Sequence, residues 1–354
     1  MLSLDLTRII FALGLLLTVC GCGSEQAKPK VTDPLEEQDF ESYILSQNFS
    51  GAVYIARDGE ILLNKGFGLA NKDSEQSNTP ETRFRIGSVS KQFTAAAILT
   101  LQEQGLLSVN DYISDHLSDF PNGTQITLKH LLTHTSGLPN YTALPDFEDY
   151  LNDELTPDEI MAMFKDLPLE FVPGSAFKYS NSGYVVLGAI IEQVSGIAYA
   201  DYMALHVFAP LQMDASGYGT NEPVAPLDAK GYKPDGSLAP YIDMSLPYAA
   251  GALVSTLGDL AKWDKALYDN TLLSTESTEL MFTPELNGYG LGWQITNIAE
   301  TEEPIHVHGG NIAGFSAVIV RFPMTRKLIV VLSNTDDYPV NKLAVNLNLI
   351  AVRQ

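Results

Sequence analysis

The sequence of 354 residues has little cysteine and comparatively little positive charge. Its two cysteines, Cys20 and Cys22, both lie near the N-terminus, so the rest of the chain has no disulfide, no thiol nucleophile and no cysteine-based metal site. Lysine and arginine number 21 against 43 aspartates and glutamates, which gives a net charge of −22. Because no basic surface is available to neutralise phosphates, we expect no nucleic-acid partner.

A short apolar segment precedes the two cysteines. Residues 9–19 follow Arg8 and are too few to cross a membrane, but they have the length of the apolar part of a signal peptide. The stretch Val19-Cys20-Gly21-Cys22 resembles a bacterial lipobox, in which a small residue precedes the cysteine that is lipidated. Gly21 meets that condition, so we expect lipidation at Cys22; the alternative is a plain secretory signal cut nearby.

The chain then divides into a tether and one folded unit. After a signal peptide at 1–21, residues 22–38 are polar and contain no aromatic side chain, which is typical of a flexible tether. Residues 39–354 read as one catalytic domain, with a mostly helical lobe at about 106–280. Strand patterns occur at both ends of this domain and helical patterns occur between them. We therefore expect an α/β fold, with one antiparallel sheet built from both termini and flanked by helices.

Local patterns place the main elements of this domain. Asp58-Gly59 between two apolar runs predicts a β-hairpin with a two-residue turn. Apolar residues at helical spacing predict a helix from about Val89 to Gln104, which Gly105 ends. Further helices are expected at 183–194, 257–268 and 340–352, and further strands at 290–295, 317–322 and 328–333.

Two Ser-x-x-Lys sequences could supply a nucleophile. Ser88 and Lys91 are three residues apart at the start of the expected helix, so both side chains lie on one face, near the positive end of the helix dipole. A desolvated lysine can lose its proton and activate the serine. Ser175 and Lys178 repeat the spacing but follow Pro173-Gly174, which predicts a loop. Taken alone, either copy is better explained by a capping serine and a solvated lysine.

Two further stretches gain meaning only together with the first. Tyr179-Ser180-Asn181 stands where a helix is expected to begin, and alone it is a turn with a helix cap. His308-Gly309-Gly310 stands between two expected strands, and alone it is a turn with an incidental histidine. The glycines would nevertheless let a ligand approach the backbone closely.

The order of the motifs resembles that of the serine β-lactamase and penicillin-binding-protein family. Its class C β-lactamase-like branch, which includes DD-peptidases, D-aminopeptidases and esterases, is the nearest. Four stretches carry the resemblance: Phe84-Arg-Ile-Gly-Ser-Val-Ser-Lys, Leu131-Leu-Thr-His-Thr-Ser-Gly-Leu-Pro, Pro173-Gly-Ser-Ala-Phe-Lys-Tyr-Ser-Asn-Ser-Gly-Tyr and His308-Gly-Gly-Asn-Ile-Ala-Gly-Phe. The resemblance implies a catalytic site between the sheet and a helical lobe, and an acyl-enzyme mechanism without metal or organic cofactor.

The resemblance also assigns roles to individual residues. It makes Ser88 the nucleophile, Lys91 its basic partner and Tyr179 the residue that moves a proton between nucleophile, leaving group and water. It makes Asn181 a residue that holds the lysine and the substrate. It places His308, Gly310 and Asn311 on an edge strand beside the substrate, with the backbone N–H groups of Ser88 and Asn311 as the oxyanion hole.

His308 departs from the β-lactamase pattern, in which a lysine occupies this position and helps to hold the substrate carboxylate. A histidine with an ordinary pKa near 6.5 is mostly neutral at pH 7.5. We therefore expect a preference for uncharged esters over carboxylate-bearing substrates, and we expect it to narrow as His308 protonates toward pH 6.

Two pairs of histidines are close enough in the sequence to be tested as metal ligands. His130 and His134 are four residues apart but lack the glutamate of a zinc-protease helix, so a structural role is favoured. His306 and His308 alternate on an expected strand, but no third ligand is evident.

The sequence as a whole predicts an exported, lipid-anchored serine hydrolase acting on a small-molecule or peptide substrate. The bond could belong to an ester or an amide. A DD-peptidase or carboxypeptidase acting on cell-wall peptides and a weak β-lactamase are alternatives. An alternative from a different functional class is a penicillin-recognising sensor or scaffold that does not turn over its ligand.

Overall fold

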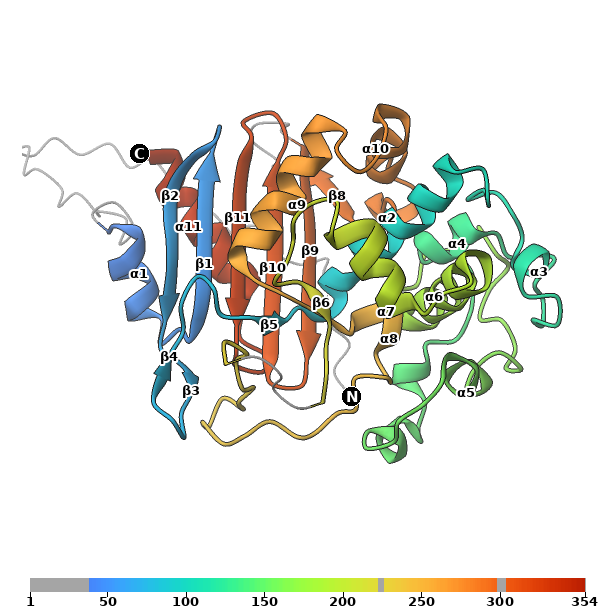
Figure 1. The fold of residues 1–354 in the computed structure, drawn as a ribbon, viewed down its shortest axis with the longest axis horizontal. Coiled ribbons are helices and arrows are strands. Elements are labelled where there is room, and N and C mark those ends of the chain that lie inside the picture. The colour runs from blue at the N-terminus through green and yellow to red at the C-terminus, as the bar shows by residue number, and fades with distance from the viewer. Residues whose placement is uncertain (1–37, 222–225, 298–303, 354) are drawn as a thin grey trace, which may run out of the picture.

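The computed structural model describes residues 38–221, 226–297 and 304–353. Within them, both ends of the chain build a six-stranded antiparallel sheet with the order β2-β1-β11-β10-β9-β8 (Figure 1). The strands are β1 (Gly51–Arg57), β2 (Glu60–Phe67), β8 (Gln294–Asn297), β9 (Pro304–Ile312), β10 (Phe315–Phe322) and β11 (Lys327–Ser333). The prediction of one sheet assembled from both termini is confirmed. The expected signal peptide, tether and Cys22 lie outside the described residues.

The expected hairpin joins β1 to β2. Asp58 and Gly59 both have positive φ, at 49° and 84°. A type I′ turn requires this combination because its twist matches that of the two strands. The register shifts by one residue between Ile55 and Ala56, where β2 bulges.

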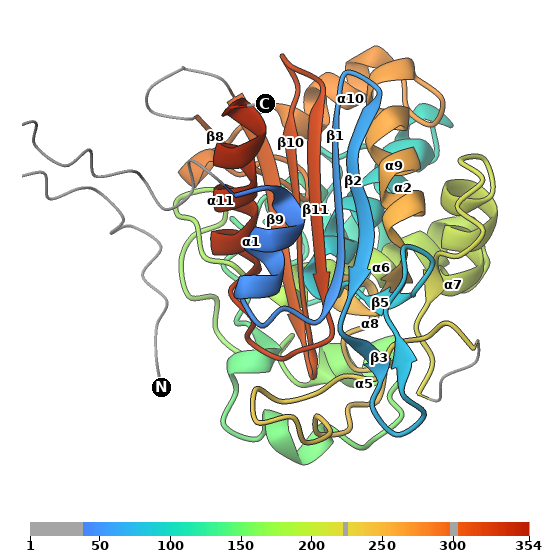
Figure 2. The same cartoon turned by 90° about the vertical axis from the view of Figure 1, so that its left-hand side faces the viewer.

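The two faces of the sheet pack against different layers, as the alternation along β11 shows. Ile329 and Val331 belong to a core shared with the two terminal helices, whereas Val330 and Leu332 belong to the larger core under the helical half. Successive side chains of a strand point to opposite faces, so a strand covered on both sides is apolar throughout. Figure 2 shows the terminal helices together on one face. They are α1 (Phe40–Ser46) and α11 (Val340–Arg353).

The other face carries the helical half of the molecule (Figure 1). Every residue of its central helix from Ser90 to Leu101 is buried, which is typical of a helix surrounded by protein. The helices are α2 (Ser90–Glu103), α3 (Ile113–His116), α4 (Leu128–Leu132), α5 (Pro157–Ala162), α6 (Asn181–Ser195), α7 (Tyr199–Tyr202), α8 (Tyr248–Gly251), α9 (Leu257–Asp269) and α10 (Thr275–Phe282). Shorter turns lie at Gly87–Val89, Tyr141–Ala143, Phe147–Tyr150, Met203–Phe208 (π-helical) and Leu286–Gly288.

The region expected to be mostly helical, 106–280, also contributes two strands to a small second sheet with the order β5-β7-β6. These are β5 (Phe84–Arg85), β6 (Gly217–Tyr218) and β7 (Leu253–Ser255), and a separate pair is formed by β3 (Leu69–Asn71) and β4 (Gln76–Ser77). The small sheet is important for the site because β5 leads directly into the Gly87–Val89 turn.

One expectation for the C-terminal part is wrong. The strand expected at 290–295 begins only at Gln294, because Gly292 has φ 75° and the N–H of Gly290 donates to the carbonyl of Trp293 in a turn. His308-Gly309-Gly310, which reads alone as a turn but which the family resemblance places on an edge strand, lies inside β9. Glycine usually weakens a strand, but it also allows another backbone to approach closely.

No single helix of the described ranges is long and apolar enough to span a membrane. Helix α6 and the segment Tyr199–Phe208 meet that length and composition only as a pair bent by 77°.

Candidate active site

Ser88 lies on the turn Gly87–Val89, between the small sheet and α2. The turn is anchored because the N–H of Ile86 donates to a backbone carbonyl of β7 at 3.0 Å. Gly87 has φ +50°, and a Cβ there would stand 2.9 Å from the backbone nitrogen of Asn311. Both the dihedral angle and the space therefore require glycine. Ser88 is held where the small sheet, the central helix and β9 meet.

The side chain of Lys91 is buried and has three polar neighbours. Its Nζ lies 3.0 Å from the Ser88 Oγ, 2.8 Å from the Asn181 Oδ1 and 2.8 Å from the Ala250 carbonyl oxygen. Lys91 is on the first turn of α2, so the i to i+3 spacing places its amine beside the serine, as the sequence predicts.

The surroundings of Lys91 favour its neutral form. Burial lowers the pKa of Lys91 well below its usual value. A neutral amine has two N–H donors and one lone pair. The two carbonyl oxygens accept the two N–H groups, and the lone pair then faces the hydroxyl hydrogen of Ser88. The arrangement can therefore remove the proton from Ser88.

Tyr179 lies immediately before α6 and faces the same pair. Its ring centroid is 4.9 Å from the Lys91 Nζ. Burial raises the pKa of Tyr179, and a hydrogen bond with Ser88 acts in the opposite direction. The phenol therefore keeps its proton at neutral pH and can donate it to an atom that occupies the space beside Ser88.

Asn181 is the first residue of α6 and is oriented by the loop before the turn Tyr141–Ala143. Its backbone N–H donates to the Asn140 Oδ1 at 2.9 Å, and its side-chain Nδ2 donates to the Thr142 Oγ1 at 3.1 Å. These contacts turn the amide oxygen of Asn181 toward Lys91. One N–H of the amide stays available for a substrate.

The end of β9 approaches the Ser88 turn backbone to backbone. β8 pairs with β9 from Pro304 to Val307. Beyond Val307, β9 is an edge strand. A Cβ on Gly310 would stand 2.0 Å from the Ile86 carbonyl oxygen and 2.9 Å from the Ser88 backbone nitrogen. The glycine is therefore needed for this contact, which brings the backbone nitrogens of Ser88 and Asn311 to one region.

His308 is buried and both of its ring nitrogens have partners. Nδ1 lies 2.7 Å from the Gly309 carbonyl oxygen, so it carries the proton, and Nε2 lies 2.8 Å from the Tyr289 hydroxyl, which donates to it. Burial, with a smaller effect of Lys91, lowers the pKa of His308 to about 3. The expectation that His308 protonates between pH 7.5 and 6 is therefore wrong, because the sequence does not show that the ring is buried.

His134 also reaches the site. Its ring centroid is 4.1 Å from that of Tyr179 and 4.6 Å from that of Tyr289, and its Nδ1 accepts the backbone N–H of Ser180 at 3.2 Å. The expected structural role fits His130, whose Nδ1 accepts the N–H of Thr127 at the start of α4. The signal for His134 was its place in the second of the four matching stretches, but its contact with Tyr179 requires the fold.

The second Ser-x-x-Lys sequence lies apart from this group. The Ser175 Oγ donates to the Val172 carbonyl at 2.6 Å, and Lys178 forms an exposed ion pair with Glu170. Ser175 thus has no amine beside its hydroxyl.

The histidine pair on β9 does not converge on one point. His306 stacks on Phe282 with 4.0 Å between ring centroids and faces Arg321, whereas His308 faces Tyr289. Within the described ranges, no three histidine, cysteine, aspartate or glutamate side chains are grouped as metal ligands.

Comparisons with known proteins agree on one family. A family model described as Beta-lactamase matches residues 35–352. The putative penicillin-binding protein PbpX of Bacillus subtilis is 40% identical over 265 residues, which cover 73% of this chain but 65% of PbpX. The chain thus spans about two thirds of that relative.

Solved structures share the fold over most of their length. A penicillin binding protein from Bacillus halodurans has a TM-score of 0.78 and 29% identity, and the match covers 89% of this chain and 99% of that one. A D-stereospecific amidohydrolase from Streptomyces has a TM-score of 0.72 and 25% identity, with 86% and 94% covered. The α/β fold with an antiparallel sheet is therefore common to all three chains.

Proposed function

Since this chain belongs to the beta-lactamase family, we propose that it is a serine hydrolase of the class C β-lactamase-like branch that forms an acyl-enzyme on Ser88. The observation that carries the proposal is the buried Lys91 amine, 3.0 Å from the Ser88 hydroxyl and provided with two other acceptors for its N–H groups. A serine becomes a strong nucleophile when a base removes its proton.

In the acylation step, Lys91 takes the hydroxyl proton while the Ser88 Oγ forms a bond to the carbonyl carbon of the substrate. The negative charge that develops on the carbonyl oxygen is stabilised by the backbone N–H groups of Ser88 and Asn311; each such donor is worth about 3 kcal/mol in comparable sites. Tyr179 donates a proton to the departing alcohol or amine, so that the ester or amide bond breaks with a neutral leaving group. The proton on Lys91 then restores the phenol.

In the deacylation step, water replaces the leaving group. Lys91, which is neutral again, removes one proton from the water, directly or through the Tyr179 hydroxyl, as the water oxygen attacks the acyl carbon. The bond between that carbon and the Ser88 Oγ breaks, and the serine regains its proton. The products are a carboxylic acid and free enzyme. All atoms are supplied by substrate, water and these side chains.

The neutral ring of His308 favours ester substrates without a carboxylate next to β9. An amide or peptide substrate is the second candidate, and the names of two relatives favour it: a penicillin-binding protein at 40% identity and a D-stereospecific amidohydrolase at 25%. A sensor that is acylated without turnover remains the alternative of another class, since it needs the same nucleophile.

Activity of purified residues 24–354 on p-nitrophenyl esters, nitrocefin and D-Ala-D-Ala peptides separates these functions. We expect turnover of at least one short ester, abolished in Ser88→Ala together with labelling by a fluorophosphonate. Ser175→Ala is the matched control and should keep nearly full activity. Labelling of Ser88 without turnover of any substrate would favour the sensor, and loss of labelling in Ser175→Ala instead would overturn the assignment of the nucleophile.

We also propose that the enzyme is exported and anchored through a lipid on Cys22. The support is the lipobox-like stretch, in which Gly21 precedes the cysteine. In a bacterial host, metabolic labelling with an alkyne fatty acid should mark the wild type and not Cys22→Ser. Cys20→Ser is the control and should be labelled; a labelled Cys22→Ser protein would refute the anchor.

A further inference from the structure

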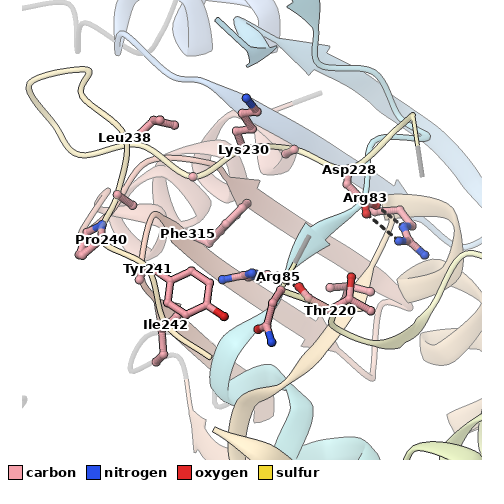
Figure 3. A pocket seen from close by; sticks show the side chains of 16 residues that line it. Arg83, Arg85, Thr220, Asp228, Lys230, Leu238, Pro240, Tyr241, Ile242 and Phe315 are labelled. Atoms are coloured by element: carbon pink, nitrogen blue, oxygen red, sulfur yellow. Dashed lines mark hydrogen bonds and ion pairs between the residues drawn. The ribbon is translucent and has the colours of Figure 1, made fainter. Parts of the chain in front are cut away.

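A pocket of about 300 Å³ lies where β5, the loop 238–242 and the turn between β9 and β10 come together (Figure 3). That volume is at the small end of the range for ligand sites, so it fits part of a substrate rather than a large ligand. Arg85, Tyr241 and Phe315 stand around it in the figure.

Three cationic side chains line the pocket, and they differ in their partners. Arg83 forms a two-point ion pair with Asp228, and Lys230 pairs with Asp73 at 2.9 Å. Arg85 instead donates to a backbone carbonyl, that of Thr220, at 3.2 Å. Among the described residues, no carboxylate lies within ion-pair distance of Arg85.

The rest of the lining suits an apolar ligand. The Arg85 guanidinium stands 6.0 Å from the ring centroid of Phe315. Leu238 and Tyr241 line the pocket and keep 55% and 47% of their surface exposed. Exposed apolar side chains beside a hollow are typical of a binding site. A ligand with an apolar stem would cover them.

The pocket is connected to the proposed nucleophile through the same two segments that carry the oxyanion donors. Arg85 is three residues before Ser88, and Ala313, which also lines the pocket, is two residues after Asn311. Three residues of extended chain span at most about 10 Å. The Cα atoms of Arg85 and Ser88 are therefore no more than about 10 Å apart, which is the length of a substrate stem of about three residues.

We propose that this pocket binds the carboxylate end of an elongated, otherwise apolar ester or amide substrate, and that Arg85 pairs with that carboxylate. The inference rests on the proposed hydrolase function and specifies its substrate class. His308 supplies no permanent positive charge on β9, so Arg85 takes over recognition of the anionic group.

A carboxylate fits this pocket better than a phosphate does. The two oxygens of a carboxylate match the planar fork of one guanidinium. A phosphate dianion would need a second cation, and the charges of Arg83 and Lys230 are already balanced by Asp228 and Asp73.

Matched esters test the proposal in the full chain. In the first pair, the acyl chain of the ester ends either in a free carboxylate or in the methyl ester of that carboxylate. In the second pair, the alcohol part carries the same two end groups. Each pair is made in several chain lengths. We expect kcat/KM to favour the carboxylate at one length in at least one pair. Arg85→Gln should lower that preference, the ratio of kcat/KM for the carboxylate to that for its methyl ester, about tenfold or more, the range expected for a charge-assisted hydrogen bond. Arg57→Gln removes the same charge from the far end of β1 and should leave the preference intact.

A second variant keeps the test decisive if Arg85→Gln does not fold. Leu238→Asp places a negative charge at the exposed rim, and we expect it to lower the same preference. An unchanged preference in Arg85→Gln or in Leu238→Asp overturns the proposal. If the wild type hydrolyses none of these esters, ester hydrolysis fails as the activity, separately from the pocket. Calorimetry then measures the affinity of the carboxylate esters for Ser88→Ala and for the double variant Ser88→Ala/Arg85→Gln. This comparison tests carboxylate binding by Arg85 without any turnover, and equal affinities overturn the proposal.

Discussion

At the scale of single residues, the two Ser-x-x-Lys sequences show that surroundings decide what a lysine does. Lys91 is buried among acceptors with its amine beside Ser88, whereas Lys178 is exposed and paired with Glu170. A buried amine loses its proton far more readily than a solvated one in an ion pair. The same four-residue spacing therefore yields a base in one place and a surface ion pair in the other.

The burial of His308 changes what pH should do to substrate preference. Because its pKa is lowered to about 3, His308 stays neutral from pH 7.5 to pH 6. We expect the ratio of kcat/KM for an uncharged ester to that for a penicillin to be flat over this range. His308→Lys should shift the ratio toward the penicillin by roughly 5–30-fold, as expected for one charge-assisted hydrogen bond.

The measurement is the ratio of the two kcat/KM values, since taking the ratio removes the pH dependence that both substrates share through Lys91 and Tyr179. Tyr289→Phe, which removes the hydroxyl partner of the His308 Nε2, is an informative companion variant and should also give a flat ratio. A ratio that changes tenfold between pH 7.5 and 6 in the wild type would show that His308 titrates there.

The resemblance of four stretches to the family was enough to group Ser88, Lys91, Tyr179 and Asn181, and in the structure Lys91 contacts the other three. The contact between His134 and Tyr179 could not be predicted. His134 adopts φ +58°, which is uncommon for a residue other than glycine, and its ring lies against that of Tyr179. This contact depends on a left-handed backbone at His134 and on a neighbour 45 residues away, and neither is marked by a local sequence pattern.

At the scale of elements, the contact between β9 and the Ser88 turn is the most demanding one for activity. In Gly310→Ala the new Cβ would lie 2.0 Å from the Ile86 carbonyl oxygen, so the turn or the strand must move. We expect kcat/KM to fall about 100-fold, since a displacement of about 1 Å in an active site can cost that much. Ester hydrolysis and thermal unfolding are the measurements.

Gly309→Ala is the matched control, because its Cβ would come no nearer than 3.7 Å to the Ala317 carbonyl oxygen, an ordinary contact. It should keep most of the activity. If both variants lose activity equally, the approach of β9 to the turn does not control catalysis.

The contact between β9 and the Ser88 turn also shows why some strand ends could be predicted from the sequence and others could not. The β1–β2 hairpin was predictable because Asp58-Gly59 has a local turn signature. At Gly309-Gly310 the same rule gave a turn, but Gly310 is needed for the contact with Ile86, more than 200 residues away in the sequence. Likewise, Gly292 ends what reads as one strand because its backbone turns there (φ 75°). Long-range packing, not local preference, sets these ends.

At the scale of the whole molecule, three buried histidines make stability depend on pH. Burial lowers the pKa values of His134, His306 and His308, the last two to about 3. Below about pH 6.5 the unfolded chain binds protons on these rings and the folded chain does not. The free energy of unfolding therefore decreases as the pH falls from about 6.5 toward 3. His306 and His308 alone give a loss of about 3 kcal/mol between pH 7.5 and 5.5, and His134 acts in the same direction.

Urea unfolding at pH 7.5 and 5.5 measures this loss. His306→Gln should reduce the difference between the two pH values by about one third, whatever it does to stability itself. His206→Gln, at an exposed position, should leave the difference unchanged. Equal free energies of unfolding at both pH values in the wild type would contradict the burial of these rings.

The position of β1 in the sheet has a consequence for how a newly made chain folds. β1 lies between β2 and β11, and the Ser333 hydroxyl donates to the carbonyl of Ser50, 283 residues earlier. The hairpin of β1 and β2 can form early, but its open edge has no partner until the ribosome has made almost the entire chain. Such long-range pairing raises the contact order and slows folding. A nascent or truncated chain that lacks β11 thus exposes the unpaired edge of β1, which is a site for aggregation.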